Sequence, residues 1–220
     1  MKNNLLIVGG DSKIAGKFID RHTKHYNVYC TSRKINKPNS RTVHLDLADT
    51  NSVNALIEDL SHVKFDGVVC FVSTYYHKII PEIRTIENDL QVNFLGIYRI
   101  AKNLNLANNS KIILLSDSAL YQPKREYFGY SVSKMLLNLY AKQLAVDLAP
   151  GTSTNLICLG PVMTNKTGKE KEKYFKKSLI RVEDPQEGLV NLIDFLLREE
   201  NLHMTGTEII YDGGRMLNRV

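Results

Sequence analysis

The chain has 220 residues, of which 43% are hydrophobic and 24% charged, and its formal net charge is +6. This length fits one α/β domain, and the composition excludes a mostly disordered chain and a collagen-like one. A basic protein invites a nucleic-acid interpretation, but residues 166–181 alone carry seven basic and two acidic side chains. Because this segment has little aromatic interleaving and the rest of the chain is nearly neutral, we expect no nucleic-acid partner.

The cysteine positions and the hydropathy of the sequence indicate the cellular compartment of the protein. Cys30, Cys70 and Cys158 lie far apart in apolar runs, without the spacing of zinc ligands. They are expected to be buried hydrophobes of a protein in a reducing compartment, and no metal site is expected. No run approaches the roughly 18 apolar residues of a membrane helix, and the apolar stretch at the start is too short for a signal peptide. We therefore expect a cytoplasmic protein that does not enter a membrane.

In chain order, strand-like runs alternate with helix-like segments. The expected strands are 5–8, 28–31, 42–45, 67–73, 112–115, 155–159 and 208–211. Helices are expected through Ile14 to Ile19 and over 51–60, 81–107, 130–148 and 185–197. Short strands that are apolar on both faces indicate a covered parallel sheet. We predict one domain over residues 1–220: a doubly wound, seven-stranded parallel sheet of the Rossmann type with helices on both faces.

The lysine-rich stretch 163–178 follows a strand end and fits neither a core helix nor a strand. We expect residues 163–180 to form a mobile substrate flap, although its lysines are equally typical of a solvated surface. Ligands of such sheets bind beyond the carboxyl ends of the strands. The flap would therefore lie over the site.

A glycine-containing loop, Val8 to Gly16, joins the first strand to the first helix. Glycine at this turn allows backbone amides to approach a pyrophosphate at the start of the helix. The loop is a weak relative of the GxGxxG motif, because Lys13 and Ala15 occupy its second and third glycine positions. Taken alone, it also fits an ordinary tight turn.

The second strand ends in Thr31-Ser32-Arg33-Lys34. A carboxylate there would bind the ribose 2′-hydroxyl of NAD, whereas Arg33 suits a 2′-phosphate. Lys13 in the neighbouring loop would add positive charge. These residues favour NADP(H) as the cofactor over NAD, and the alternative is a solvated basic turn.

A YxxxK motif is formed by Tyr130 and Lys134. Residues four apart share one face of a helix, so the phenol and the ammonium would lie side by side near a strand end. A neighbouring cation stabilises a tyrosinate, so we expect Lys134 to lower the pKa of Tyr130 toward a catalytically useful range. Such a pair alone is also common on surfaces.

Taken together, these motifs resemble the short-chain dehydrogenase/reductase family over essentially the whole chain. The resemblance rests on the glycine loop, Asp46 after the third strand, Asn93, the Tyr130/Lys134 pair, the segment Leu159 to Thr164 and the final Asp212-Gly213-Gly214. It implies a catalytic set of Tyr130, Lys134, Asp117 and Asn93. The implied cofactor residues are Gly9, Asp11, Ser12, Lys13, Ile14, Ser32, Arg33, Asp46, Leu47, Ser73, Lys134, Gly160, Val162 and Thr164.

The position of the family's catalytic serine, thirteen residues before the tyrosine, holds Asp117, with Ser116 and Ser118 on either side. An aspartate there is similar to the pteridine reductase and dihydromonapterin reductase branch. That resemblance implies NADPH-dependent reduction of a C=N bond in a dihydropterin, with Asp117 orienting Tyr130 or the pterin nitrogens. Tyr75, Tyr121 and Pro161 are the expected substrate contacts, and Asn93 would hold a water linking Lys134 to solvent.

The sequence is compatible with two other functions. One is a general ketone or 3-oxoacyl reductase of the same family that uses Ser116 or Ser118. The other is a dinucleotide-binding protein without activity, against which the intact Tyr130/Lys134 pair argues. In every case the expected partner is a small molecule, and the family resemblance implies a homodimer or homotetramer.

Overall fold

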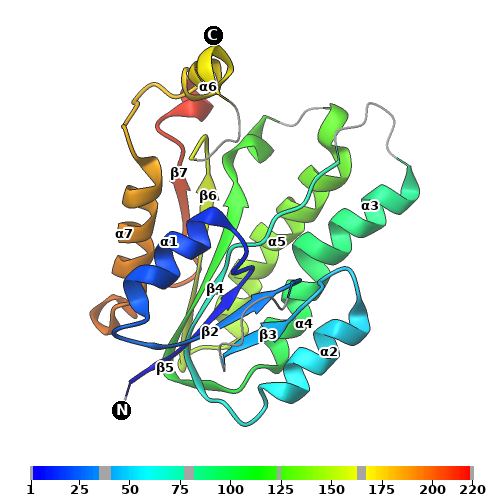
Figure 1. Cartoon of the computed structure of the whole chain (residues 1–220), viewed down its shortest axis with the longest axis vertical. Coiled ribbons are helices and arrows are strands. Elements are labelled where there is room, and N and C mark those ends of the chain that lie inside the picture. The colour runs from blue at the N-terminus through cyan, green and yellow to red at the C-terminus, as the bar shows by residue number, and fades with distance from the viewer. Residues whose placement is uncertain (1, 35–40, 77–81, 123–124, 163–166, 219–220) are drawn as a thin grey trace.

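A seven-stranded parallel sheet forms the centre of the protein (Figure 1). The computed structural model describes residues 2–34, 41–76, 82–122, 125–162 and 167–218. The strands run in the order β3-β2-β1-β4-β5-β6-β7, and each neighbouring pair is parallel. Their bounds are β1 (Asn4–Val8), β2 (Asn27–Ser32), β3 (Thr42–His44), β4 (Phe65–Cys70), β5 (Leu106–Asp117), β6 (Thr152–Leu159) and β7 (Glu208–Tyr211). The predicted sheet is confirmed.

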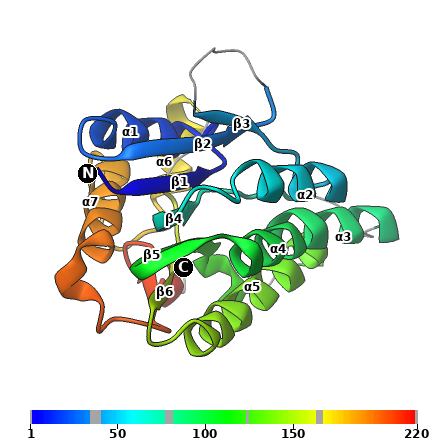
Figure 2. The ribbon, with the colours of Figure 1, turned by 90° about the horizontal axis from the view of Figure 1, so that it is seen from below.

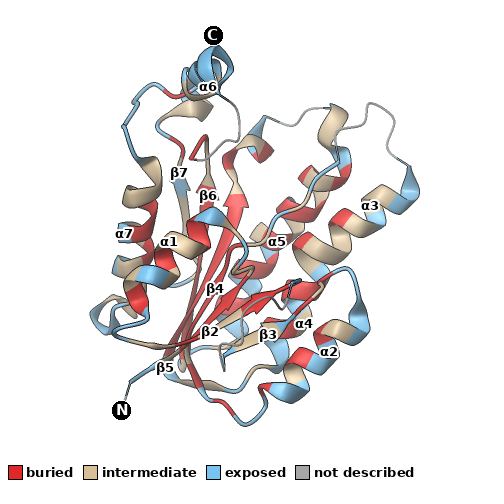
Figure 3. Cartoon of the chain, in the orientation of Figure 1, coloured by how far each residue is buried: buried red, intermediate tan, exposed pale blue. Residues whose placement is uncertain are grey.

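Helices cover both faces of this sheet, as predicted (Figure 2). One face carries α1 (Lys13–His22) and α7 (Pro185–Leu197), and the other carries α2 (Thr50–Asp59), α4 (Gly96–Asn103) and α5 (Phe128–Asp147). Side chains alternate along each strand, so Leu5 and Ile7 pack under the first pair while Leu6 and Val8 pack under the second group. Figure 3 shows the resulting buried sheet between partly exposed helices.

The carboxyl ends of the strands meet at one edge, and the strand order reverses beside β1. From β1 the chain moves outward to β2 and β3, and then returns to the other side of β1 as β4. In a doubly wound sheet this reversal opens a crevice in which ligands bind. The loops that follow β1, β2, β4, β5 and β6 therefore provide the candidate site.

The segment 81–107, expected as one helix, is interrupted. It consists of α3 (Ile83–Leu90), a π-helical turn (Gln91–Leu95) and α4, which ends at Asn103. The last residues of the expected helix instead begin β5, where Leu106 pairs with Phe65. The extra residue in the π-helical turn brings Asn93 inward, where its side chain is fully buried.

The lysine-rich segment contains a short helix on the surface. Residues Gly168–Phe175 form a short helix, α6, in which no residue is buried. The described part of the segment is therefore an exposed helix and not a core helix or a strand, because good helix formers such as Lys and Glu dominate these positions without an apolar stripe. No helix among the described residues is long and apolar enough to cross a membrane.

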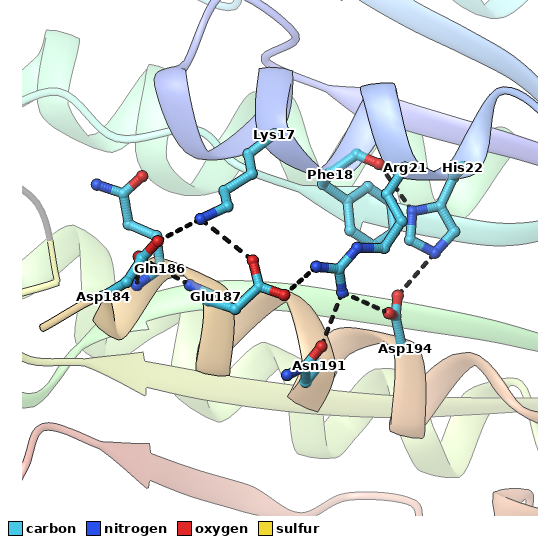
Figure 4. Close-up of polar contacts among 9 residues, drawn as sticks. All are labelled: Lys17, Phe18, Arg21, His22, Asp184, Gln186, Glu187, Asn191 and Asp194. Atoms are coloured by element: carbon cyan, nitrogen blue, oxygen red, sulfur yellow. Dashed lines mark hydrogen bonds and ion pairs between the residues drawn. The ribbon is translucent and has the colours of Figure 1, made fainter. Parts of the chain in front are cut away.

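A polar clasp joins α1 to α7 (Figure 4). Lys17 forms ion pairs with Asp184 and Glu187, and Arg21 forms ion pairs with Glu187 and Asp194. Asp184 also caps α7, because its Oδ1 accepts hydrogen bonds from the backbone N–H groups of residues 186 and 187. The clasp holds α7 against the helix whose N-terminus borders the ligand crevice.

The buried end of this clasp is His22. Its Nε2 lies 2.7 Å from Oδ1 of Asp194, and its Nδ1 lies 2.7 Å from the carbonyl oxygen of Phe18. Oxygen atoms therefore lie next to both ring nitrogens. The ring also stacks on Phe18, with 4.0 Å between the centroids.

Candidate active site

Two adjoining clefts lie at the carboxyl edge of the sheet. The larger has a volume of about 400 Å³ and is lined by the loops after β1, β2, β3 and β4. The smaller has a volume of about 240 Å³ and contains Asp117 and Tyr130. Ser73, which follows β4, lines both. One ligand seated in the larger cleft would therefore reach the side chains of the smaller one.

The glycine loop shapes the floor of the larger cleft. Gly9 has a φ of +88°, and a Cβ there would lie 2.9 Å from the side chain of Val72. A Cβ at Gly10 would lie 3.1 Å from the carbonyl oxygen of Thr31. The backbone can therefore come this close only as glycine. Ser12 caps the N-terminus of α1, which gives the cleft the helix end that suits a pyrophosphate.

The residues of this cleft fit a nicotinamide dinucleotide. Its volume falls within the roughly 300–1,000 Å³ of cofactor sites. Eight of the expected cofactor residues line it, and they come from four separate loops: Gly9, Asp11, Ser12, Ser32, Arg33, Asp46, Leu47 and Ser73. The glycine cradle and the helix N-terminus would hold the phosphates. Asp46 and Leu47 line the same cleft, and their expected contact with the cofactor stays a prediction.

The end of β2 carries a carboxylate that the local sequence does not show. Oδ1 of Asp11 accepts a hydrogen bond from Oγ of Ser32 at 2.7 Å, and its Oδ2 accepts one from the backbone N–H of Arg33 at 3.1 Å. The expected cluster of one hydroxyl and two cations therefore includes an anion from the neighbouring loop. This anion weakens the sequence argument for a 2′-phosphate at this place.

The other expected cofactor residues lie elsewhere. Lys13 is exposed, and Ile14 is buried in the core beneath α1. Gly160 packs against Asp212, and Val162 lines a separate cavity near the end of β6. Thr164 falls outside the described residues.

Asp117 and Tyr130 meet in the smaller cleft. Asp117 ends β5, and Tyr130 lies in the first turn of α5. The Tyr130 hydroxyl donates a hydrogen bond to Oδ2 of Asp117 at 2.8 Å, and Oδ1 of Asp117 accepts one from the N–H of Ala119 at 2.6 Å. Of the three residues around the family's serine position, Asp117 is the one bonded to the phenol.

The two flanking serines lie in different surroundings. Oγ of Ser116 donates a hydrogen bond to Oδ1 of Asn138 at 2.6 Å. Ser118 is fully buried beyond the strand end. Successive residues of a strand point to opposite faces, which explains why Asp117 and Ser116 do not share a partner.

Lys134 is fully buried beneath the same cleft. Its Nζ donates hydrogen bonds to the carbonyl oxygens of Val72 at 3.0 Å and Leu115 at 3.1 Å. The ammonium thus ties together the ends of β4 and β5. Burial lowers the pKa of Lys134 to about 8, and the charge of Asp117 acts in the opposite direction.

The expected lowering of the Tyr130 pKa by Lys134 is not observed in this structure. Burial and the charge and hydrogen bond of Asp117 raise the pKa of Tyr130 well above its usual value, and only a hydrogen bond with Ser73 acts against them. A buried phenol that donates to a carboxylate holds its proton more firmly. The phenol of Tyr130 is therefore protonated at neutral pH.

Asn93 fixes the loop after β4. Its Oδ1 accepts from the N–H of Thr74 at 2.9 Å, and its Nδ2 donates to the carbonyl oxygen of Thr74 at 2.8 Å and to Oγ of Ser133 at 3.1 Å. Both amide donors are therefore used within the protein. The expected role in holding a water stays a prediction, while the observed contacts position the loop that carries Ser73.

Tyrosine side chains line the smaller cleft. Of these, Tyr75 was expected as a substrate contact. The ring of Tyr75 meets those of Tyr127 and Tyr130 edge-on, with centroids 5.8 and 5.9 Å apart. Tyr174 of α6 faces the same cleft. Tyr121 and Pro161, also expected as substrate contacts, are not among the lining residues, and Pro161 borders the cavity near the end of β6 instead.

Two cationic residues of the smaller cleft, Lys177 and Arg215, were not predicted as site residues. Arg215 lies 85 positions from Tyr130 in the sequence, so no local pattern connects them. The sequence feature that could identify Arg215 as a site residue is its position directly after Asp212-Gly213-Gly214, a turn that follows the carboxyl end of a strand.

A glycine-floored crevice at the strand reversal, with Tyr130 and Lys134 on α5, is typical of nicotinamide-dependent oxidoreductases built on a Rossmann fold. A family model described as Enoyl-(Acyl carrier protein) reductase matches residues 19–215. The chain belongs to the short-chain dehydrogenase/reductase family.

Individual relatives agree with this assignment. The chain is 30% identical to a 3-alpha-(or 20-beta)-hydroxysteroid dehydrogenase of Mycobacterium tuberculosis over 80% of this chain and 70% of that protein. It is 25% identical to the 3-oxoacyl-[acyl-carrier-protein] reductase FabG of Buchnera aphidicola over 96% and 87%. A short chain dehydrogenase family protein from Francisella tularensis shares the fold, with a TM-score of 0.88, 23% identity and coverage of 99% and 100%.

Proposed function

We propose that this protein is an NADPH-dependent reductase that adds hydride to a C=N bond of a dihydropterin-like substrate. The observation that carries the proposal is the carboxylate of Asp117, which lies in the substrate cleft on the Tyr130 hydroxyl. A pterin presents amino and ring N–H donors, and a carboxylate accepts them. A ketone has no such donors.

The carboxylate retains capacity for a ligand. Each oxygen of Asp117 accepts one hydrogen bond within the protein, from Ala119 and from Tyr130. A carboxylate has about four lone-pair positions, so it can accept further donors from a substrate. The tyrosine-lined walls suit a flat ring, because aromatic rings pack favourably on one another in edge-on or offset arrangements.

Proton delivery follows from the Tyr130–Asp117 pair. A nicotinamide cofactor held in the larger cleft, which Gly9 and Ser12 line, would supply hydride chemistry toward the carbon of the C=N bond. The Tyr130 hydroxyl gives its proton to the nitrogen, and solvent returns a proton to the phenol. Because burial and Asp117 raise the Tyr130 pKa, the phenol is protonated at neutral pH and ready to act as a general acid. Lys134 holds the two strand ends that frame this pair.

The preference for NADPH rests on the exposed cations after β2. Arg33 lines the cofactor cleft, and Lys34 follows it. Arginine binds a phosphate with a bidentate geometry that suits the 2′-position. Asp11 opposes this preference with a negative charge at the same edge, so the selectivity depends on the balance between Asp11 and Arg33.

A general carbonyl reductase is the second candidate. The names of the relatives favour it, because the M. tuberculosis and B. aphidicola proteins are a hydroxysteroid dehydrogenase and a 3-oxoacyl reductase. A Tyr130 that donates a proton serves a ketone oxygen equally well. The difference between the two candidates therefore lies in Asp117.

The deciding experiment is a substrate panel with purified protein. NADPH oxidation is followed with dihydromonapterin, dihydrobiopterin, dihydrofolate and a set of ketones that includes 3-oxoacyl thioesters, and NADH is tested in parallel. Turnover of a dihydropterin supports the proposal. Turnover of ketones without any dihydropterin would replace it by the second candidate.

A further inference from the structure

We propose that Arg215, together with Lys177, forms an anion-binding subsite in the substrate cleft, so that the substrate carries a carboxylate away from its reacting end. The inference deepens the proposed function and rests on the cleft at Tyr130 being the substrate site. It names a property of the substrate that the Tyr130–Asp117 pair does not specify.

The cleft contains opposite charges. Asp117 is the one acidic side chain among its described lining residues, and Lys177 and Arg215 are the two cationic ones. The ammonium of Lys177 lies 6.0 Å from the centre of the Tyr174 ring. Burial raises the pKa of the Tyr174 phenol, and the Arg215 guanidinium partly offsets that rise, so the two side chains are electrostatic neighbours. Both cations therefore lie by the α6 wall of the cleft.

The backbone that presents Arg215 is firmly held. Asp212 accepts hydrogen bonds from the N–H groups of Gly214 at 2.8 Å and Met216 at 2.9 Å. Gly213 and Gly214 have φ of +62° and +78°, and a Cβ on Gly213 would lie 2.6 Å from the carbonyl oxygen of Ile180. Such a turn requires glycine. Arg215 therefore projects from a preorganised turn at the sheet edge.

Two further contacts fasten this turn to the walls of the cleft. Nε2 of Gln122 donates to the carbonyl oxygen of Met216 at 3.0 Å, and Oγ of Ser178 donates to that of Asp212 at 3.0 Å. Gln122 itself lines the cleft, and Ser178 follows Lys177 directly. The two segments that carry the cations are thus joined to each other and to the end of β5.

Arg215 has no acidic partner in the part of the chain that the structure describes. None of the ion pairs there involves it, and Asp117 uses its oxygens for Tyr130 and Ala119. A half-buried guanidinium in a ligand cleft is a strong binder of carboxylates, because its planar fork makes two parallel hydrogen bonds. The geometry selects a substrate with donors near Tyr130 and a carboxylate near Arg215.

The test compares acids with uncharged analogues. The first pair is dihydrofolate and dihydrobiopterin, and the second is acetoacetate and methyl acetoacetate. The Arg215→Leu variant is expected to raise the KM of the acid by about 10- to 100-fold, as for loss of a charge-assisted hydrogen bond. The KM of the uncharged partner and the kcat of both should stay within about twofold, and Arg215→Lys should keep part of the acid's advantage.

Arg181→Leu is the matched control, because it removes an equal charge from a neighbouring segment that lines a different cavity. An equal rise in KM for acid and neutral partner, or the same effect in Arg181→Leu, would overturn the subsite. If only ketones turn over, the second pair decides the subsite while the pterin proposal fails. If nothing turns over, equilibrium binding of folate and biopterin to wild type and Arg215→Leu decides it.

Discussion

The hydroxyl of Tyr130 donates its hydrogen bond to Oδ2 of Asp117 at 2.8 Å. Lys134 instead binds the carbonyl oxygens of Val72 and Leu115. The Tyr130 hydroxyl and the Lys134 ammonium of the YxxxK motif therefore bind different partners in this structure. Asp117 keeps the proton on the phenol, and Lys134 holds together the strand ends that frame it.

Removing the charge of Asp117 should change both the pKa of Tyr130 and the substrate preference of the enzyme. In Asp117→Asn we expect the pKa of Tyr130 to fall, because the carboxylate that raises it is gone. We expect the ratio of dihydropterin to ketone turnover to fall about 10- to 100-fold, because the acceptor for substrate N–H groups is lost. Steady-state rates on both substrate classes and their pH profiles measure the two effects.

Tyr130→Phe provides the reference for this variant, with an expected loss of about 10²- to 10⁴-fold in kcat/KM on every substrate. Tyr26→Phe is the control, since it removes a phenol just before β2, at the opposite edge of the sheet. An Asp117→Asn enzyme with wild-type rates on dihydropterins would remove Asp117 from the mechanism.

The pH dependence of kcat/KM should reflect the protonation state of Lys134. Burial lowers the pKa of Lys134 to about 8, so the side chain is charged below pH 8 and loses its proton as the pH rises through that value. If the ammonium is required, kcat/KM for reduction falls by about tenfold per pH unit above pH 8. The Lys134→Met variant should show a low rate without this alkaline limb, and an unchanged limb in the variant would assign it to another group.

The spacing of residues along the sequence was sufficient to predict the features that depend on residues close to one another in the chain. The strand pattern and the glycine loop involve residues close in sequence and are present in the structure, as is the placement of Tyr130 and Lys134 near the start of one helix. The functional groups of these two residues nevertheless bind different partners. The contact between Asp11 and Ser32 joins residues 21 positions apart on two loops. It exists only because β1 and β2 are parallel neighbours in the sheet, so the residues at the end of β2 alone do not indicate the carboxylate.

Burial explains the remaining differences. The lowered pKa expected for Tyr130 followed from its spacing to Lys134, but the desolvation of both groups and the bond to Asp117 are properties of the folded chain. The place of Arg215 in the cleft likewise depends on a turn held by Asp212. Such long-range contacts carry no periodic signal in a single sequence.

Cofactor selectivity should respond to the two charges at the end of β2. Asp11→Asn removes the anion and is expected to raise the ratio of kcat/KM for NADPH to that for NADH by about tenfold, or ~1.4 kcal/mol. Arg33→Asp should lower the same ratio by at least as much. Asp20→Asn, an equal change at an exposed position of α1, is the control. A ratio that is insensitive to both Asp11 and Arg33 would show that the 2′-position binds elsewhere.

The clasp between α1 and α7 should contribute to stability in a salt-dependent way. Asp194 contacts both Arg21 and the buried ring of His22, so Asp194→Asn leaves two cationic or donor groups without their carboxylate. We expect a loss of about 1 kcal/mol, which lowers Tm by about 2–4 °C for a chain of this size. Glu200→Gln, whose pair with Arg198 is exposed and 3.9 Å long, should leave Tm unchanged.

Thermal unfolding at low and high ionic strength separates the contributions. Screening weakens the exposed pairs of Lys17 and Glu187 more than the contact between Asp194 and buried His22. The difference in Tm between wild type and Asp194→Asn should therefore persist at high salt, whereas the difference for Glu187→Gln should shrink. Loss of both differences at high salt would mean that the His22–Asp194 contact adds nothing beyond surface electrostatics, and that α7 is held on α1 by apolar packing alone.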